Sequence, residues 1–220
     1  MRRNTAELSV QEIGIEVDGL IFQGDLTMPQ DAKGLVVFAH GSGSSRLSPR
    51  NRFVADVLVE SGQATLLVDL LTQKEEHDRV NVFDVELLAH RLREITRKVL
   101  VRPETNGLRL GYFGASTGAA AALVAAATDS PRVSAVVSRG GRPDLAGGWL
   151  TRVTAPALLL VGGLDPVVLE LNQAAFAKLP GEKRLEIIPG ASHLFEERGT
   201  LEAVAAYAAD WFDRFLVAPG

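Results

Sequence analysis

Five consecutive residues near the middle of the chain could form a nucleophilic site: Gly114-Ala115-Ser116-Thr117-Gly118. They follow an apolar run typical of a buried strand and precede an alanine-rich stretch typical of a helix. A serine on such a tight turn exposes its hydroxyl, and glycines two residues away on either side avoid collisions with strand and helix backbone. The following helix directs free N–H groups and positive dipole toward the reacting centre. Ser116 is therefore the predicted nucleophile, and a turn without chemistry is the alternative.

A serine hydroxyl needs a base to accept its proton, and the chain contains four histidines. His193 is the predicted base because it comes after the serine and after the last predicted strand, on a loop that could reach across. The other three have simpler interpretations. His77 lies in a charged loop, His90 lies within a long predicted helix, and His40 ends a strand where a structural hydrogen bond is expected.

An acid must orient the base, and Asp165 is predicted to do so for His193. It leaves the predicted strand that precedes the histidine's strand, and Pro166 then breaks the chain so that the carboxylate can turn inward. Asp144, in the loop one strand earlier, is the alternative. Either aspartate could instead cap a helix.

Negative charge that develops during acyl transfer needs two backbone donors, an oxyanion hole. The N–H of Thr117, directly after the nucleophile, is predicted to be one of them. The other is expected in the loop of residues 40–45, where Ser42 is preferred and Gly43 competes. Glycine-rich loops also bind phosphates, but no lysine follows this one in the phosphate-loop pattern and nothing matches Gly-x-Gly-x-x-Gly.

Three arginines follow predicted strands at the same edge and could recognise a carboxylate or phosphate on a substrate. Arg46 follows the glycine–serine loop, and Arg139 and Arg142 follow a later strand. Arg46 and Arg139 are the predicted substrate-binding residues. The alternative is that all three stabilise loops or pair with nearby carboxylates.

The elements that must position these residues alternate between strand and helix patterns. Residues 10–17 and 20–28 flank Asp18-Gly19, which favours a hairpin. Further strands are predicted at 34–39, 64–69, 108–113, 132–138, 157–161 and 184–188. Helices are predicted after Ser48-Pro49, around 85–99, at 117–128, around 168–179 and around 201–215.

This order predicts an α/β protein whose sheet of about eight mostly parallel strands carries helices on both faces. The functional loops of such sheets lie at the carboxyl ends of the strands. Residues 139–156 are too few for a large cap domain, so an open site for small soluble substrates is expected.

Composition narrows the function further. A chain of 220 residues suits one domain spanning 1–220, and a net charge of −4 without a basic face disfavours nucleic-acid binding. The absence of cysteine excludes disulfides, thiolate metal sites and a cysteine nucleophile. No apolar run approaches a membrane span and none follows Met1-Arg2-Arg3, so a cytoplasmic location without membrane contact is expected.

Four motifs in this order resemble the dienelactone hydrolase-like branch of the α/β-hydrolases over essentially the whole chain: His40-Gly-Ser-Gly-Ser-Ser45, Gly114-Ala-Ser-Thr-Gly118, Gly162-Gly-Leu-Asp165 and Gly190-Ala-Ser-His193. The resemblance implies the α/β-hydrolase fold, a triad of Ser116, His193 and Asp165, and an oxyanion hole at Ser42 and Thr117. Some similar hydrolases are joined to phosphoribosyltransferase domains.

Dienelactone hydrolase proper uses a cysteine nucleophile, which this chain lacks, so hydrolysis of small carboxylic esters is expected instead of lactone specificity. The expected reaction needs no metal or organic cofactor, and its partner is a small ester. Thioester hydrolysis or acyl transfer on the same triad is an alternative. A catalytically silent binding protein on this fold is another.

Overall fold

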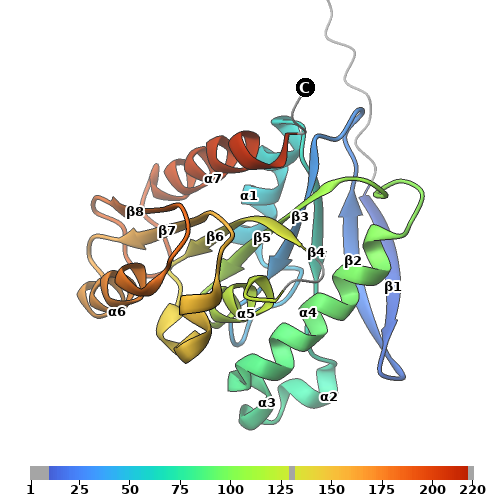
Figure 1. Cartoon of the computed structure of the whole chain (residues 1–220), viewed down its shortest axis with the longest axis horizontal. Coiled ribbons are helices and arrows are strands. Elements are labelled where there is room, and N and C mark those ends of the chain that lie inside the picture. Colours follow the sequence, from blue (N-terminus) through green and yellow to red (C-terminus); the bar gives the residue numbers. More distant parts are fainter. Residues whose placement is uncertain (1–9, 129–131, 218–220) are drawn as a thin grey trace, which may run out of the picture.

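Eight strands of the computed structural model, which describes residues 10–128 and 132–217, form one sheet in the order β1-β2-β4-β3-β5-β6-β7-β8 (Figure 1). The β1–β2 and β2–β4 pairs are antiparallel, and the other neighbouring pairs are parallel. The predicted α/β-hydrolase sheet is confirmed. The strands are β1 (Val10–Val17), β2 (Leu20–Thr27), β3 (Gly34–Ala39), β4 (Ala64–Val68), β5 (Arg109–Ala115), β6 (Val133–Arg139), β7 (Ala157–Gly162) and β8 (Lys183–Ile188).

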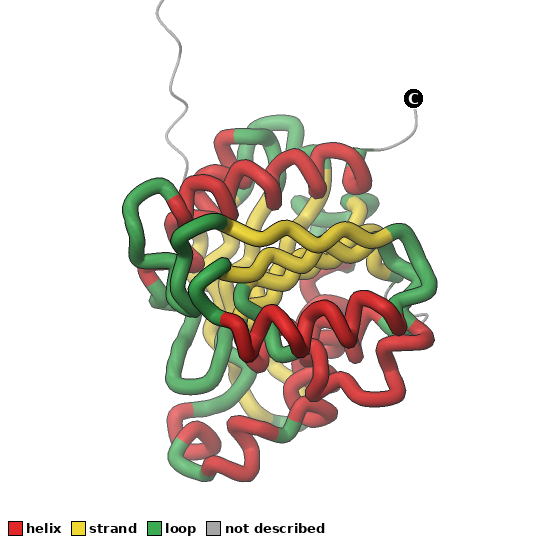
Figure 2. Tube along the Cα trace, turned by 90° about the vertical axis from the view of Figure 1, so that its left-hand side faces the viewer, coloured by secondary structure: helices red, strands yellow, loops and turns green. Residues whose placement is uncertain are grey.

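Helices cover both faces of this sheet, as Figures 1 and 2 show. α1 and α7 pack on one face, and α4, α5 and α6 pack on the other. Every residue of β3 and β4 is buried, as expected of parallel strands covered on both sides. The helices are α1 (Pro49–Glu60), α2 (Gln73–Glu76), α3 (Arg79–Phe83), α4 (Val85–Leu100), α5 (Thr117–Ala126), the 3₁₀ helix η1 (Pro143–Arg152), α6 (Pro166–Lys178) and α7 (Thr200–Leu216).

The hairpin predicted at Asp18-Gly19 is confirmed. Both residues have positive φ, 53° and 76°, which is the backbone of a two-residue turn that follows the twist of its strands. The Asp18 carboxylate lies 3.0 Å from His90 Nε2 and 3.2 Å from Arg91 Nη1, both on α4. His90 therefore helps to hold the β1–β2 turn against α4.

Three short helices were absent from the sequence prediction: α2, α3 and η1. Helices of four and five residues give no readable periodicity. A capping box did mark the first of them, because the Thr72 hydroxyl accepts from Glu75 N at 3.3 Å while the Glu75 carboxylate accepts from Thr72 N at 2.8 Å. No large cap domain interrupts the described residues.

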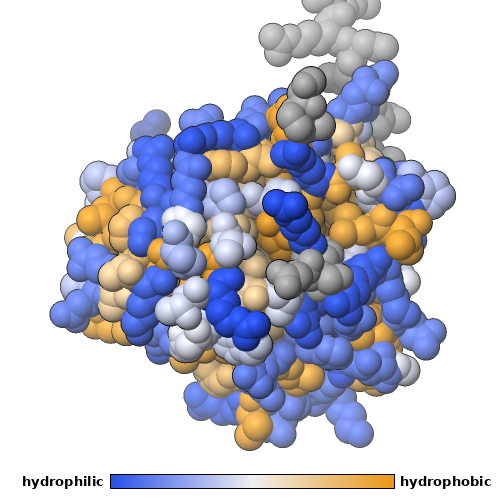
Figure 3. All heavy atoms as spheres, in the orientation of Figure 1, coloured by the Kyte–Doolittle hydropathy of each residue, from blue (hydrophilic) through white to orange (hydrophobic). Residues whose placement is uncertain are grey.

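The face drawn in Figure 3 is mainly hydrophilic, with hydrophobic atoms in separate patches. Within the described ranges, no helix is both long enough and apolar enough to cross a membrane.

Close packing of α5 against β3 depends on a residue without a side chain. A Cβ at Gly118 would lie 2.2 Å from the carbonyl oxygen of Ala39, and a Cβ at Gly114 would lie 2.4 Å from Ala119 Cα. These backbones cannot separate without displacing the turn at Ser116. Any side chain at Gly114 or Gly118 would therefore collide with neighbouring backbone.

We expect Gly118→Ala to destabilise the fold by roughly 2 kcal/mol or more, because the added methyl overpacks a backbone contact that cannot relax easily. The thermal unfolding midpoint measures the effect. Gly148→Ala is the matched control, since nothing lies within 4 Å of a Cβ there. Similar midpoints for the two variants would contradict the assigned role of this contact.

Candidate active site

The turn between β5 and α5 places Ser116 in a strained conformation, with φ 52° and ψ −121°. Two backbone hydrogen bonds hold it to the last residue of β6 and to the loop that follows. Ser116 N donates to Arg139 O at 3.2 Å, and Arg142 N donates to Ser116 O at 3.0 Å. The predicted strand–turn–helix context of this serine is present.

The loop after β3 lies directly over Ser116. A Cβ at Gly41 would be 2.9 Å from Ser116 Cβ and 3.1 Å from Ala115 O. A larger residue at position 41 would push the loop away. The glycine thus allows residues 40–45 to border the hydroxyl.

His193 and Asp165 form a close pair, with 2.7 Å between Nδ1 and Oδ2. Asp165 also caps α6, because its other carboxylate oxygen accepts from Val168 N at 3.4 Å. The two carboxylate oxygens of Asp165 therefore have different partners, His193 Nδ1 and the backbone N of Val168. A proton on Nδ1 directed at the carboxylate leaves Nε2 of the neutral ring free to accept one.

The His193 loop crosses the backbone next to Ser116. A Cβ at Gly140 would lie 3.1 Å from His193 O and 3.7 Å from the ring atom Cε1. Gly140 directly follows Arg139, whose carbonyl accepts from Ser116 N. Among the described residues Ser116 Oγ makes no hydrogen bond to His193, and such bonds are often long before substrate binds.

The alternative acid and two other histidines have different partners. Asp144 receives two hydrogen bonds from Arg142, at 2.8 and 2.7 Å, which also raise the pKa of Arg142. The buried His40 accepts from Leu70 N at 3.2 Å through Nε2 and contacts its neighbour's carbonyl through Nδ1. His77 ends α2 and contacts Gln73 O.

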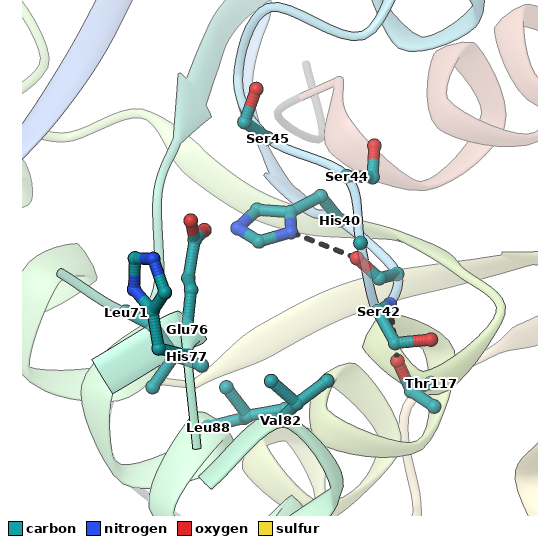
Figure 4. A pocket seen from close by; sticks show the side chains of 12 residues that line it. His40, Ser42, Ser44, Ser45, Leu71, Glu76, His77, Val82, Leu88 and Thr117 are labelled. Atoms are coloured by element: carbon teal, nitrogen blue, oxygen red, sulfur yellow. Dashed lines mark hydrogen bonds between the residues drawn. The ribbon is translucent and has the colours of Figure 1, made fainter. Parts of the chain in front are cut away.

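A hydrogen bond joins the two segments predicted to form the oxyanion hole. Ser42 N donates to Thr117 Oγ1 at 2.9 Å, which fixes the loop to the first residue of α5 (Figure 4). Gly43 has a φ of 68° and its missing Cβ faces open space. Ser42 is therefore the loop residue whose amide lies beside the turn.

A cavity of about 420 Å³ opens beside this hydrogen bond. Its polar wall carries the loop serines, Glu76 and His77, and its apolar wall carries Leu71, Val82 and Leu88 (Figure 4). The short helices α2 and α3 supply part of this lining, so a segment expected to be an exposed loop contributes to the pocket.

Arg46 lies between two carboxylates at the end of the same loop. Its Nε is 3.2 Å from Asp25 Oδ1, its Nη1 is 3.7 Å from Asp69 Oδ2, and its backbone N donates to Asp69 Oδ1 at 2.7 Å. These contacts favour a role in holding the loop. Substrate binding by Arg46 stays a prediction.

The buried Arg139 side chain lies on the α1 side of the sheet, where Nη2 donates to Asn51 Oδ1 at 3.5 Å. Burial, with a smaller effect of the Arg50 charge, lowers the pKa of Arg139 to about 10. The guanidinium remains charged at neutral pH. Arg139 thus stands beside the turn at Ser116 without a carboxylate partner in the described residues.

Sequence reasoning missed Glu197, whose carboxylate accepts from Ser192 N at 3.0 Å and so fastens the loop next to His193. Hydrogen bonds from Ser192 lower the pKa of Glu197 below the ordinary glutamate value of 4.5. No motif marks this residue, because a loop's internal hydrogen bonds depend on its folded path.

We expect Glu197→Ala to lower the thermal midpoint near pH 7 and to lose this effect as the pH falls. A lowered folded-state pKa stabilises the fold above about 4.5, and the contribution disappears as the pH falls through the folded-state value. Thermal unfolding across this range measures it. Glu202→Ala is the control, since Glu202 lines the same small surface cavity of about 340 Å³ as Glu197. An identical pH profile in both variants would contradict the stabilising role of the Glu197–Ser192 hydrogen bond.

The chain matches the dienelactone hydrolase family over residues 22–217. It is 53% identical to a dienelactone hydrolase from Anabaena variabilis, with a TM-score of 0.92 over 96% of this chain and 99% of that one. It is 18% identical to Est1E from Butyrivibrio proteoclasticus, with a TM-score of 0.79 over 94% of this chain and 98% of that one, which supports the fold alone.

Relatives in two strains of Mycobacterium tuberculosis, named "Putative phosphoribosyl transferase", are 59% identical over 210 residues, or 96% of this chain. The chain spans about half of their length, 47%. The fold, the serine turn between β5 and α5 and the family match agree with one another. The chain belongs to the dienelactone hydrolase family of the α/β-hydrolases.

Proposed function

We propose that this hydrolase cleaves small carboxylic esters through an acyl-enzyme on Ser116. The observation that carries the proposal is the contact of 2.7 Å between His193 Nδ1 and Asp165 Oδ2. The loop that carries His193 also passes beside the strained serine turn. A base oriented by an acid next to an accessible serine is the arrangement that nucleophilic catalysis requires, and Ser116 is half-buried.

In the proposed reaction, His193 Nε2 accepts the proton of Ser116 Oγ as that oxygen attacks the ester carbonyl. Asp165 holds the ring and stabilises its positive charge. The same proton passes to the departing alcohol when the carbon–oxygen bond of the ester breaks. Water then gives a proton to His193 as it attacks the acyl-enzyme, and Ser116 regains a proton when the acid leaves.

The amides of Thr117 and Ser42 are proposed to bind the oxygen that becomes negative in each tetrahedral intermediate. Ser42 N donates to the Thr117 hydroxyl. The substrate oxygen can reach the Ser42 N–H if the Thr117 hydroxyl rotates away, or if the N–H is shared between the two oxygens. The Thr117 side chain thus keeps the Ser42 amide in place between turnovers.

The cavity beside these donors supports small substrates. Its volume of about 420 Å³ is at the lower end of ordinary ligand pockets. It combines an apolar wall with serine hydroxyls, which suits a short acyl or alcohol group that also carries polar atoms. A cytoplasmic location stays a prediction from sequence.

Thioester hydrolysis and transfer of the acyl group to another acceptor use the same residues. The transferase name of the Mycobacterium tuberculosis relatives refers to proteins of which this chain covers 47%. We propose no phosphoribosyl transfer here, because the serine turn and the His–Asp pair match acyl chemistry.

We expect a fluorophosphonate probe to label the wild-type protein and to fail with Ser116→Ala, because the probe reacts only with an activated serine. Gel fluorescence or intact mass measures the labelling. Ser134→Ala, at the opposite end of β6, is the control and should label normally. An unlabelled wild type would exclude the enzyme proposal and favour a silent binding protein.

Asp165→Asn should lower kcat/KM for p-nitrophenyl acetate by roughly 10⁴-fold, because an amide favours the wrong histidine tautomer. Asp144→Asn is the matched control. It removes a carboxylate that pairs with Arg142, so the rate should change little. If Asp144→Asn instead gives the larger loss, the assignment of the acid is wrong.

A further inference from the structure

Arg139 carries a buried charge with little to balance it. The residue is 8% exposed, and its hydrogen bond to Asn51 Oδ1 is long, at 3.5 Å. Within residues 10–128 and 132–217, its Nε and Nη1 have no hydrogen-bond partner. No carboxylate of the described residues lies within ion-pair distance of it.

An arrangement of this kind is costly unless something negative is bound. A buried charge without a partner loses its hydration and gains nothing in return. Deprotonation does not remove the cost, since the pKa of Arg139 falls only to about 10. The face of Phe195, 5.8 Å from the guanidinium carbon, offers weak compensation.

Other positive groups surround the same spot. Arg50, in the first turn of the twelve-residue helix α1, acts on Arg139 electrostatically and has a buried Nε without a partner in the described residues. The N-terminal end of α1 adds positive dipole, although Ser48 already accepts from the amides of Asn51 and Arg52. Asn51 follows Arg50 on that turn.

A cavity of about 340 Å³ lies beside this spot. Arg50 and Phe195 line it, and the Phe195 ring is the one that faces the Arg139 guanidinium. Its rim also carries acidic residues. Glu196 pairs with Arg50 Nη1 at 3.1 Å and is exposed, whereas Glu197 is held by Ser192. Glu196 therefore competes with a ligand for Arg50 and leaves Arg139 unbalanced.

We propose that Arg139, Arg50 and the N-terminal turn of α1 form an anion-binding site that takes a carboxylate or phosphate group. A planar guanidinium with two unused N–H directions suits the paired oxygens of such a group. The site lies across the sheet end from the 420 Å³ cavity, which is lined by α2 to α4 and the loop of residues 40–45.

Binding there connects directly to the proposed catalytic loop. Arg139 accepts a hydrogen bond from Ser116 N through its carbonyl, and Phe195 lies two residues after His193. The anion can arrive as a free ion or as the acidic group of an ester. Its binding does not depend on Ser116 chemistry, so the proposal can be tested separately from catalysis.

The test compares thermal unfolding midpoints of the wild type, Arg139→Met and Arg139→Lys in sodium phosphate and in sodium acetate, at constant ionic strength. Phosphate or acetate should raise the wild-type midpoint by at least about 2 °C at saturation, since a ligand of the folded state stabilises it. Arg139→Met should show no rise. Arg139→Lys, which keeps the charge, should show a smaller one.

Arg142→Met is the matched control, because Arg142 lies three residues away and is paired with Asp144. It should respond to anions as the wild type does, which separates binding from general salt effects on stability. Without added anion, Arg139→Met should unfold no earlier than the wild type, because it removes an unbalanced buried charge at similar volume. Glu196→Gln should enlarge the phosphate effect.

Kinetics then distinguish the two sources of the anion. The preference is measured as the ratio of kcat/KM for an acid-bearing ester to that for a neutral ester. If Arg139→Met lowers this ratio roughly 10- to 100-fold, the anion is part of the substrate. An unchanged preference together with the midpoint shift assigns it to a free ion. The proposal is overturned if wild type and Arg139→Met respond to both anions equally, whatever the outcome of serine labelling.

Discussion

The strained turn at Ser116 is the constraint on which the rest of the site depends. With φ at 52°, the chain leaves β5 and enters α5 within one residue, and the two elements must then lie very close to β3. Gly118 meets the backbone of Ala39, and Gly41 meets Ser116 itself. Backbone contacts of this kind tolerate no added methyl group. They place the Ser116 side chain, the loop after β3 and the N-terminus of α5 within one small volume.

Polar contacts outside the turn keep the surrounding loops in place. Arg46, between Asp25 and Asp69, fastens the end of the loop of residues 40–45 to β2 and to the residue that follows β4. The Glu197 carboxylate fastens the loop of His193. The Thr117 hydroxyl bridges to the Ser42 amide. Such support matters because a catalytic group displaced by a fraction of an ångström loses much of its effect.

The two sides of the serine turn differ in character. Toward α2 to α4, a cavity combines apolar side chains with serines and Glu76. Toward α1, the buried Arg139 and its neighbour Arg50 create positive potential behind Phe195. The proposed ester chemistry and the proposed anion site would therefore lie on opposite sides of the turn. The carboxyl ends of β5 and β6 separate the two regions.

By itself, the sequence determined the class of sheet, the hairpin at Asp18-Gly19 and the serine turn, because period, turn chemistry and glycine spacing are local properties. Chain order also indicated which histidine and aspartate would meet, since carboxyl ends of parallel strands share one edge. Only tertiary structure decided how Arg46 and Arg139 differ: one lies between two carboxylates and the other is buried without any. Both were expected at the same edge of the sheet, but charge balance depends on residues brought together from distant strands and helices. The sequence could not predict that α2 and α3 line the 420 Å³ cavity, for the same reason.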